Sequence, residues 1–185
     1  MRLEGKVAII TGGAHGMGAV EAILFAKEGA KVVVADIRED DARKVEAEIT
    51  EAGGEAMVVM LDVSKEDQWE QAISDVIAKF GKLDILVNNA AIPFFIPTSE
   101  FPEHRFKRMQ EVQVYGPLHL SQLVLPSMIE RKTGWIVNIS SHAALHPKPD
   151  VGGGGGTVYG MCKAALERFT TGLASEVYDD NVAVN

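Results

Sequence analysis

Tyr159 and Lys163 are the residues of this chain whose types and spacing most directly suggest catalysis. They belong to the segment Tyr159-Gly160-Met161-Cys162-Lys163, and this spacing puts both side chains on one face of a helix. A phenol with its ordinary pKa of about 10 is a poor base near neutral pH, but a neighbouring ammonium group favours the phenolate. The pair is therefore a candidate general acid/base, although a solvated helix face is the commoner reason for such a pair in isolation.

A glycine-rich segment, Thr11-Gly12-Gly13-Ala14-His15-Gly16-Met17-Gly18, follows an apolar run and opens a helical pattern. Glycines permit a tight turn and let the backbone approach a pyrophosphate, while a helix N-terminus offers unpaired N–H groups and a positive dipole end. The segment predicts a dinucleotide site, and an ordinary glycine-rich loop is the alternative. The candidate cofactor contacts in it are Gly12, His15, Gly16, Met17 and Gly18.

Asp36 favours the dinucleotide interpretation. It ends a β-branched run that follows the glycine-rich segment, where a carboxylate can accept both hydroxyls of an adenosine ribose. A 2′-phosphate would meet a negative charge there, so we expect NAD, with NADP less favoured. Ile37 is the next candidate contact, and the nearby cations His15 and Arg38 weaken the preference.

Three further apolar runs end in residues that can bind a ligand. Asp62-Val63, Asn88-Asn89-Ala90-Ala91 and Ser140-Ser141 each follow such a run, and ligands of open α/β sheets lie beyond the carboxyl ends of the strands. Asp62 is a candidate for the adenine amino group or for a helix cap. Val63, Asn89 and Ala90 are further candidate cofactor contacts, and we expect Asn88 to satisfy backbone groups where the central strands diverge. A serine hydroxyl at the third site can bind a substrate oxygen.

These residues must be positioned by strands and helices that alternate along the chain. The expected strands cover residues 7–11, 31–36, 55–61, 83–87, 135–139 and 182–184; the expected helices cover 16–28, 39–52, 64–80, 101–130 and 159–178. Such alternation implies right-handed crossovers and a parallel sheet covered on both faces. We therefore predict an α/β protein with a Rossmann-type doubly wound sheet, three layers α/β/α, and a single domain over residues 1–185.

Local signals add detail to these elements. Val20, Ile23, Leu24 and Lys27 are spaced to share a face of the first helix, and Ser64 with Asp67 predicts a capping box. Gly81 is expected to stop the helix that follows. Pro117 and Pro126 are expected to interrupt the long helical stretch 101–130.

Composition excludes several classes of protein. The 185 residues are 46% hydrophobic and 24% charged, and 18 Lys+Arg against 26 Asp+Glu give a net charge of −8. This balance disfavours a disordered chain and nonspecific binding to nucleic acid or an anionic membrane. No apolar stretch approaches the roughly 20 residues that span a bilayer. Cys162 is the only cysteine, so we expect no intrachain disulfide and a reducing, cytoplasmic location. We expect no metal site.

Taken together and in this order, the motifs resemble those of the classical short-chain dehydrogenases/reductases. They are the glycine segment TGxxxGxG, Asp62, Asn88-Asn89-Ala90, Ile139-Ser140-Ser141 and the YxxxK of Tyr159 and Lys163, and they cover essentially the whole chain. The resemblance implies hydride transfer between NAD(H) and a secondary alcohol or ketone. It implies Tyr159 as general acid/base, Lys163 as the residue that lowers its pKa and holds the nicotinamide ribose, and Ser141 as the residue that orients the substrate. It also implies a homodimer or homotetramer, through helical faces near residues 106–125 and 159–178.

The departures from the family pattern bear on activity. Gln113, in Val112-Gln113-Val114-Tyr115-Gly116, stands where the family has a catalytic Asn. Its extra methylene displaces the amide, and a proton relay is sensitive to shifts of about 1 Å. A relay through the backbone carbonyl would tolerate Gln113. Ala91 replaces a family glycine, a change expected to be minor. Family members also continue into a seventh strand and substrate-covering helices, which this sequence lacks.

Two segments leave alternatives open. The run of residues 152–156, all glycine, lies between Ser141 and Tyr159; it is interpreted as a surface loop, a lid beside a substrate pocket, or glycines in place of unassigned residues. Ile92, Phe94, Phe95 and Ile96 suggest a hydrophobic or alicyclic substrate or else ordinary core. The alternative to an enzyme is a non-catalytic or truncated NAD-binding Rossmann protein with an incomplete active site.

Overall fold

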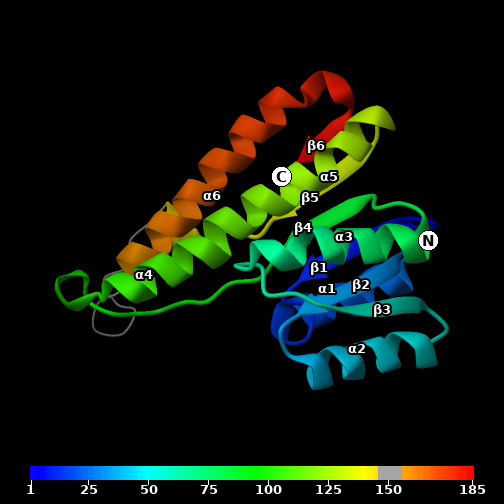
Figure 1. The fold of residues 1–185 in the computed structure, drawn as a ribbon, viewed down its shortest axis with the longest axis horizontal. Coiled ribbons are helices and arrows are strands. Elements are labelled where there is room, and N and C mark those ends of the chain that lie inside the picture. The colour runs from blue at the N-terminus through cyan, green and yellow to red at the C-terminus, as the bar shows by residue number, and fades with distance from the viewer. Residues whose placement is uncertain (146–155) are drawn as a thin grey trace.

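The computed structural model describes residues 1–145 and 156–185, and within them six strands form one sheet in the order β3-β2-β1-β4-β5-β6 (Figure 1). The strands are β1 (Val7–Thr11), β2 (Lys31–Asp36), β3 (Glu55–Met60), β4 (Ile85–Asn88), β5 (Gly134–Asn138) and β6 (Val182–Val184). Every neighbouring pair is parallel. The order reverses between β1 and β4, as in a doubly wound sheet, so the predicted fold class is confirmed.

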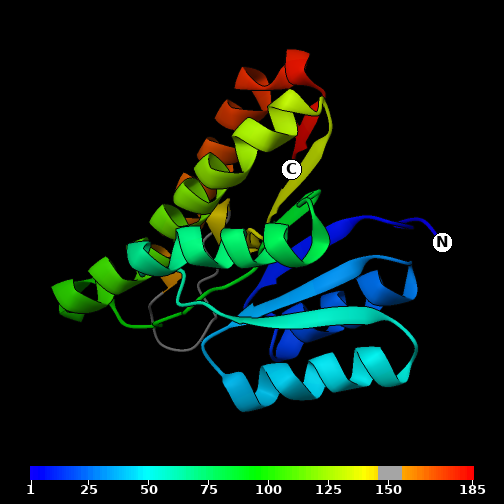
Figure 2. The same ribbon diagram turned by 45° about the vertical axis from the view of Figure 1, so that its right-hand side comes forward.

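Helices cover the sheet on both faces (Figure 2). The α-helices are α1 (Gly16–Lys27), α2 (Glu39–Glu51), α3 (Glu66–Phe80), α4 (Glu103–Gln110), α5 (Gly116–Glu130) and α6 (Gly156–Glu176). Alternate residues of β1 and β2 enter two separate cores. Ile10 and Val34 pack with α1 and α2, while Ile9 and Val33 pack with α3, α5 and α6. This alternation explains why the central strands read as continuous apolar runs.

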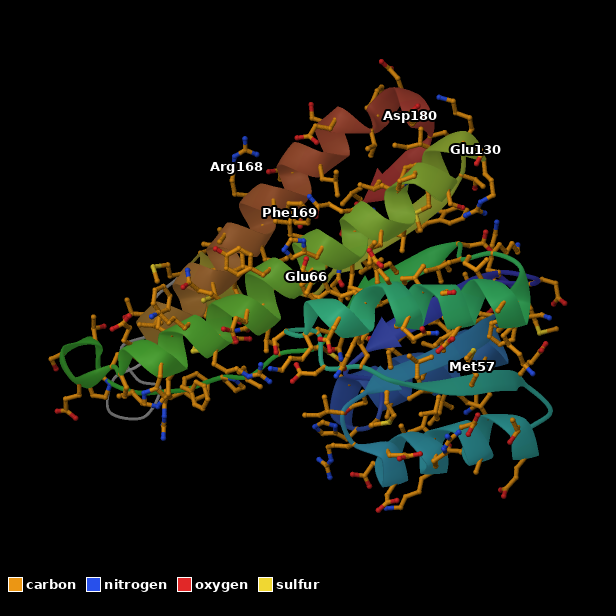
Figure 3. The ribbon with its side chains drawn as sticks, in the orientation of Figure 1. Met57, Glu66, Glu130, Arg168, Phe169 and Asp180 are labelled. Atoms are coloured by element: carbon orange, nitrogen blue, oxygen red, sulfur yellow. The ribbon has the colours of Figure 1, made fainter. Side chains whose placement is uncertain are left out.

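Helix α6 contributes its apolar side to the second core. Phe169 lies toward α5 and packs against that core, whereas the neighbouring Arg168 points away from the molecule (Figure 3). The helix ends at Glu176, and the short 3-10 helix η4 (Tyr178–Asp180) then leads into β6. None of the helices among the described residues is long and apolar enough to cross a membrane.

The long helical stretch has no break at Pro126, contrary to expectation, whereas the turn before Pro117 departs from α-helical bonding. Helix α4 runs into a π-helical turn, η2 (Glu111–Tyr115), and then directly into α5. Pro117 lies in the first turn of α5 and Pro126 inside that helix. The irregularity is η2 itself, where the Gly116 N–H donates to the carbonyl of Glu111, five residues back. Pro117 has no N–H to donate to the carbonyl of Gln113, four residues before it, so regular α-helical bonding cannot continue through this point.

The face of α1 that Val20 and Leu24 share is turned outward. Val20 and Leu24 are exposed, and the residues of α1 that are buried are Gly18 and Ala22. These small residues face inward because the helix lies close to the glycine-rich turn. A Cβ on Gly18 would come within 2.2 Å of the Gly12 carbonyl oxygen.

The predicted capping box at the start of α3 is also wrong. The N-cap residue is Lys65, and no side chain caps the helix. The Ser64 hydroxyl instead donates to Asp62 Oδ1 at 2.7 Å and accepts from Arg108 Nη1, so its oxygen is engaged away from the helix. At the other end, Gly81 has φ +79° and terminates α3 as predicted.

Candidate active site

A cleft of about 450 Å³ lies at the carboxyl ends of the central strands. Every predicted cofactor contact lines it: Gly12, His15, Gly16, Met17, Gly18, Asp36, Ile37, Asp62, Val63, Asn89, Ala90, Tyr159 and Lys163. The parallel strands explain this convergence, since their carboxyl ends share one edge of the sheet. Of the four predicted catalytic residues, Tyr159 and Lys163 line the cleft, whereas Ser141 and Gln113 are not among its lining residues.

The glycine-rich turn after β1 forms one wall of this cleft. Gly12 and Gly16 have positive φ angles of 67° and 57°, a conformation that side chains rarely adopt. The N-cap of α1 is His15, which makes no side-chain hydrogen bond to the helix. The first-turn N–H groups therefore have no side-chain cap, and the positive end of the helix dipole faces the cleft wall. This wall fits an anionic group such as a pyrophosphate.

Asp36 is buried at the end of β2 and already holds the neighbouring backbone. Its Oδ2 accepts the Ala14 N–H and its Oδ1 accepts the Arg38 N–H, both at 3.0 Å. Each oxygen retains a lone pair toward the cleft, because a carboxylate oxygen accepts two hydrogen bonds. His15 Nδ1 lies 4.0 Å from Oδ2, and the Arg38 guanidinium pairs with Asp41 rather than with Asp36.

The backbone role expected of Asn88 belongs to its neighbour Asn89. The Asn89 side-chain amide donates to the carbonyls of Thr11 and Gly12 at 3.0 and 3.2 Å and so braces the glycine-rich turn. Asn88 is buried and donates instead to the side chain of Asn138 on β5 at 2.8 Å. Successive residues at a strand end point to opposite sides, and only Asn89 faces the turn.

Lys163 is the most deeply buried cation at the cleft. Its side chain is 2% exposed, and its Nζ donates to the Ile139 carbonyl at 2.6 Å. Nζ lies 5.9 Å from the centre of the half-buried Tyr159 ring. The prediction that the two side chains lie on one face of a helix is therefore confirmed. Burial lowers the pKa of Lys163 to about 8, since desolvation penalises the ammonium form.

The two serines after β5 hold different partners. The Ser141 hydroxyl accepts the Ala143 N–H at 3.2 Å and caps the 3-10 helix η3 (His142–Ala144). Ser140 lines the cleft, and its hydroxyl donates to Glu167 on α6 at 2.6 Å. Helix α6 packs closely on η3, where a Cβ on Gly160 would lie 2.4 Å from the Ala143 carbonyl oxygen. This contact sets the distance between the serine turn and the turn of α6 that carries Tyr159.

Gln113 lies in the π-helical turn η2 and is completely buried. Its Nε2 donates to the Ile92 carbonyl at 3.4 Å, and its Oε1 has no hydrogen-bond partner among the described residues. A buried amide oxygen without a donor is costly, so this oxygen calls for a partner beyond the residues that the structure describes.

An apolar cluster surrounds Tyr159. Met109, Val158 and Cys162 are buried together, and Phe94 and Ile92 pack against them. Burial raises the pKa of the Cys162 thiol. Phe95 differs from its neighbours: it is 54% exposed, with its ring centre 5.9 Å from that of Tyr159. Of the apolar set after β4, Phe95 is thus the large side chain most available to a ligand.

Several lining residues were missed by sequence reasoning. They are Leu61, Arg108 and Val112, whereas Ala91, Ile92, Ile139 and Ser140, which also line the cleft, belong to motifs that the sequence points to. Arg108 comes from α4, which the chain reaches long after Asp62, and no local pattern links the two. Its Nη2 lies 2.9 Å from Asp62 Oδ2. The described residues contain no group of His, Cys, Asp or Glu side chains that could hold a metal ion.

The sheet order and the cleft at its switch point define a doubly wound α/β protein with a Rossmann-like fold. The chain belongs to the short-chain dehydrogenase family, whose model matches residues 6–185. The 7alpha-hydroxysteroid dehydrogenase of Escherichia coli (strain K12) is 39% identical over 189 residues, which cover 100% of this chain and 70% of that protein. The chain is therefore short relative to this homologue.

Solved structures agree with this membership. A metagenomic short-chain oxidoreductase in complex with NADP has a TM-score of 0.90 and 34% identity, over 98% of this chain and 80% of that one. NAD+-bound xylitol dehydrogenase has a TM-score of 0.92 and 31% identity, over 100% of this chain and 70% of that one. The protein is thus an oxidoreductase of this family, and its relatives use nicotinamide dinucleotides of both kinds.

Proposed function

We propose that the protein transfers a hydride between NAD(H) and a secondary alcohol or its ketone, with Tyr159 as general acid/base. The observation that carries this proposal is the buried Lys163 on the same helix face as Tyr159, at a cleft whose far wall is the glycine-rich turn. Family membership supports the reaction class. The pair would otherwise have little reason to be here, since an unpaired buried lysine is costly to the fold.

The described residues fit a dinucleotide. The uncapped first turn of α1 would hold the pyrophosphate, and the free lone pairs of Asp36 would accept the adenosine ribose hydroxyls. When bound, the nicotinamide ring accepts or donates the hydride. We place NAD ahead of NADP because the buried Asp36 carboxylate would repel a 2′-phosphate, while the Arg38 guanidinium is engaged by Asp41.

Tyr159 would take the alcohol proton during oxidation and return it during reduction. The Lys163 ammonium stabilises the phenolate that the first of these steps requires, and its bond to the Ile139 carbonyl fixes its position. Ser141 would orient the substrate oxygen by donating its O–H, which a hydroxyl can do while its oxygen accepts the Ala143 N–H. Gln113 would complete a proton relay toward Lys163, either through its backbone carbonyl or through its unpartnered Oε1.

A hydrophobic, ring-bearing substrate fits the surroundings of Tyr159 best. Phe95 offers an exposed aromatic face beside the Tyr159 ring, Ile92 lines the cleft, and Phe94 packs against the buried cluster. The E. coli relative is by name a hydroxysteroid dehydrogenase, whereas the solved relative is a xylitol dehydrogenase. The exposed phenylalanine favours the first chemistry over a polyol, because burying an aromatic face gains free energy only against an apolar partner.

The test combines cofactor binding with turnover. NADH binding is followed by fluorescence, and oxidation is measured with cyclohexanol, 2-propanol and xylitol. We expect NADH to bind and cyclohexanol to have the highest kcat/KM. Tyr159→Phe should lower kcat by on the order of 1,000-fold while NADH affinity stays within about threefold. Retained turnover in this variant would refute the acid/base role.

A second candidate function is a non-catalytic NAD-binding protein, and the identity of residue 113 is the observation that favours it. Gln113 replaces the family asparagine, and its Oε1 has no partner among the described residues. NADH binding without turnover on any alcohol, not rescued by Gln113→Asn, would favour this reading over the enzyme.

A further inference from the structure

Arg108 lies at the end of the cleft that is formed by Leu61, Asp62 and Val63. Its guanidinium spans three neighbours: Nη2 donates to Asp62 Oδ2 at 2.9 Å, and Nη1 donates to the Ser64 hydroxyl and lies 3.5 Å from Glu111 Oε2. Its side chain is 36% exposed, so one part remains open to the cleft. This arginine therefore ties α4 to the turn after β3.

The Asp62 carboxylate has one hydrogen-bond acceptor position that no described residue uses. Its Oδ1 accepts both the N–H and the hydroxyl of Ser64, at 3.0 and 2.7 Å, which uses both lone pairs. Its Oδ2 accepts Arg108 alone among the described residues. One acceptor position thus remains, on an oxygen whose place is fixed by the guanidinium. Burial opposes ionisation of Asp62, but the bonds from Ser64 and Arg108 outweigh it and keep its pKa below the ordinary value.

We propose that Arg108 is a positioning residue of the nucleotide site that fixes Asp62 Oδ2 so that its free lone pair accepts the exocyclic 6-amino group of adenine. The inference rests on the proposed NAD(H) function and adds the means by which the base is selected. The guanidinium also offsets the carboxylate charge, so that this end of the cleft suits a neutral base that carries an amino donor. A base with an oxo group at the same place would set an acceptor against an acceptor.

The competing explanation is that Arg108 merely ties α4 to β3. The two explanations differ in base selectivity, because a purely structural tie would weaken every dinucleotide alike. Nicotinamide hypoxanthine dinucleotide is the appropriate probe, since it differs from NAD in having an oxo group in place of the 6-amino group. Arg105 provides a matched control: it lies on the same helix, 5.0 Å from the Phe94 ring centre, and is not among the cleft residues.

The experiment measures the dissociation constants of NADH and of reduced nicotinamide hypoxanthine dinucleotide by fluorescence titration in the wild type, Arg108→Met and Arg105→Met, and compares kcat/KM for the two oxidised forms. We expect the wild type to prefer NAD by about tenfold, as a hydrogen bond to a charged group provides. Arg108→Met should bring this ratio close to one, and Arg105→Met should keep it. Asp62→Asn combined with Arg108→Met should lower the ratio no further than Arg108→Met alone.

Three outcomes would overturn the inference: a wild type without preference, an unchanged ratio in Arg108→Met, or an equal loss in Arg105→Met. Should Arg108→Met fail to fold, Arg108→Lys serves, since an ammonium cannot hold Asp62 and Ser64 in the same fork; an unchanged ratio there also overturns it. Failure of the proposed function looks different, because the wild type would then bind the two dinucleotides with the expected preference and oxidise no alcohol with either.

Discussion

At the scale of single residues, the site depends on two charged side chains whose burial opposes folding. Lys163 is almost completely buried with one carbonyl as its hydrogen-bond partner, and Asp36 is buried with two backbone donors. Neither group can be replaced by an uncharged residue without changing both stability and ligand binding. The two predictions that follow separate these effects.

Lys163 should make stability rise with pH. Its pKa is about 8 in the folded protein against an ordinary value of 10.5, so between these values the unfolded chain binds more protons. The stabilisation is complete above about pH 10.5, decreases as the pH falls from 10.5 to about 8, and is fully lost below about 8; the full difference is on the order of 3 kcal/mol. Urea unfolding at pH 7 and pH 10 should show this gain in the wild type and not in Lys163→Met. The exposed Lys79→Met is the control, and parallel profiles for all three proteins would contradict the prediction.

Asp36→Ala should reduce the preference for NAD over NADP. The substitution removes the acceptors for the ribose hydroxyls and the charge that repels a 2′-phosphate, so NAD binds more weakly and NADP more strongly. We expect the ratio of the two affinities, measured by fluorescence titration of NADH and NADPH, to fall at least tenfold. Asp40→Ala, an exposed change at the start of α2, should leave the ratio alone. An unaltered ratio in Asp36→Ala would remove the ribose role.

At the scale of elements, the π-helical turn η2 is the feature that links helix geometry to chemistry. Because Pro117 cannot donate to the Gln113 carbonyl, a helix that would otherwise be regular opens at the point where it faces the cleft. π-turns of this kind are frequent at functional sites. Gln113 lies buried in this turn, and Pro117 leaves its backbone carbonyl without the usual donor four residues on, while its side-chain Oε1 has no partner among the described residues.

Pro117→Ala should lower turnover by supplying the missing N–H. The new donor can bond to the Gln113 carbonyl, close the turn and withdraw that oxygen from a proton relay. We expect kcat to fall by on the order of tenfold, while NADH affinity and thermal stability are maintained. Pro126→Ala, inside the same helix, is the control and should keep kcat. An equal kcat in both variants would show that the relay does not use this carbonyl.

Much of the fold and the cofactor wall could be predicted because their signals are local. A β-branched run that ends in Asp36 predicts, from local sequence alone, that this carboxylate lies at the carboxyl end of a strand. The errors arise where a distant residue decides. Ser64 caps no helix because its hydroxyl oxygen accepts from Arg108, a residue of a distant helix, while its O–H donates to Asp62. Asn88 and Asn89 are indistinguishable in sequence, and only the orientation of β4 against the glycine-rich turn assigns the bracing role to the second.

At the scale of the whole molecule, the sheet is covered unevenly. On the α1 and α2 side, the core ends over β4 and reaches β5 only through the partly buried Val137 and Ile139. Trp135 of β5 is 36% exposed, beneath the Lys6 ammonium 4.5 Å away. On the other side α5 and α6 lie side by side and extend beyond the sheet (Figures 1 and 2). Tyr115 and Met161 are exposed on these two segments.

We propose that these helical faces associate two or four copies of the chain. Burying Tyr115 and Met161 against a second copy would remove exposed apolar surface, as symmetric dimers commonly do. Sedimentation should give two or four times the 20.0 kDa of one chain. Tyr115→Glu should shift the protein toward the monomer, and Ile77→Glu, on the exposed side of α3, should not. A wild type that is strictly monomeric at micromolar concentration would end this proposal.

The rate at which Cys162 is labelled by a thiol reagent can report local opening of the protein. The thiol is enclosed between α6 and α4, next to Lys163 in sequence, and no other cysteine competes with it. A thiol reagent therefore labels the protein only when the start of α6 separates from α4, and the rate of labelling counts those separations. The same turn carries Tyr159, so a ligand bound against this turn would lower the rate of Cys162 labelling. That rate therefore reports whether the site is occupied, without any turnover.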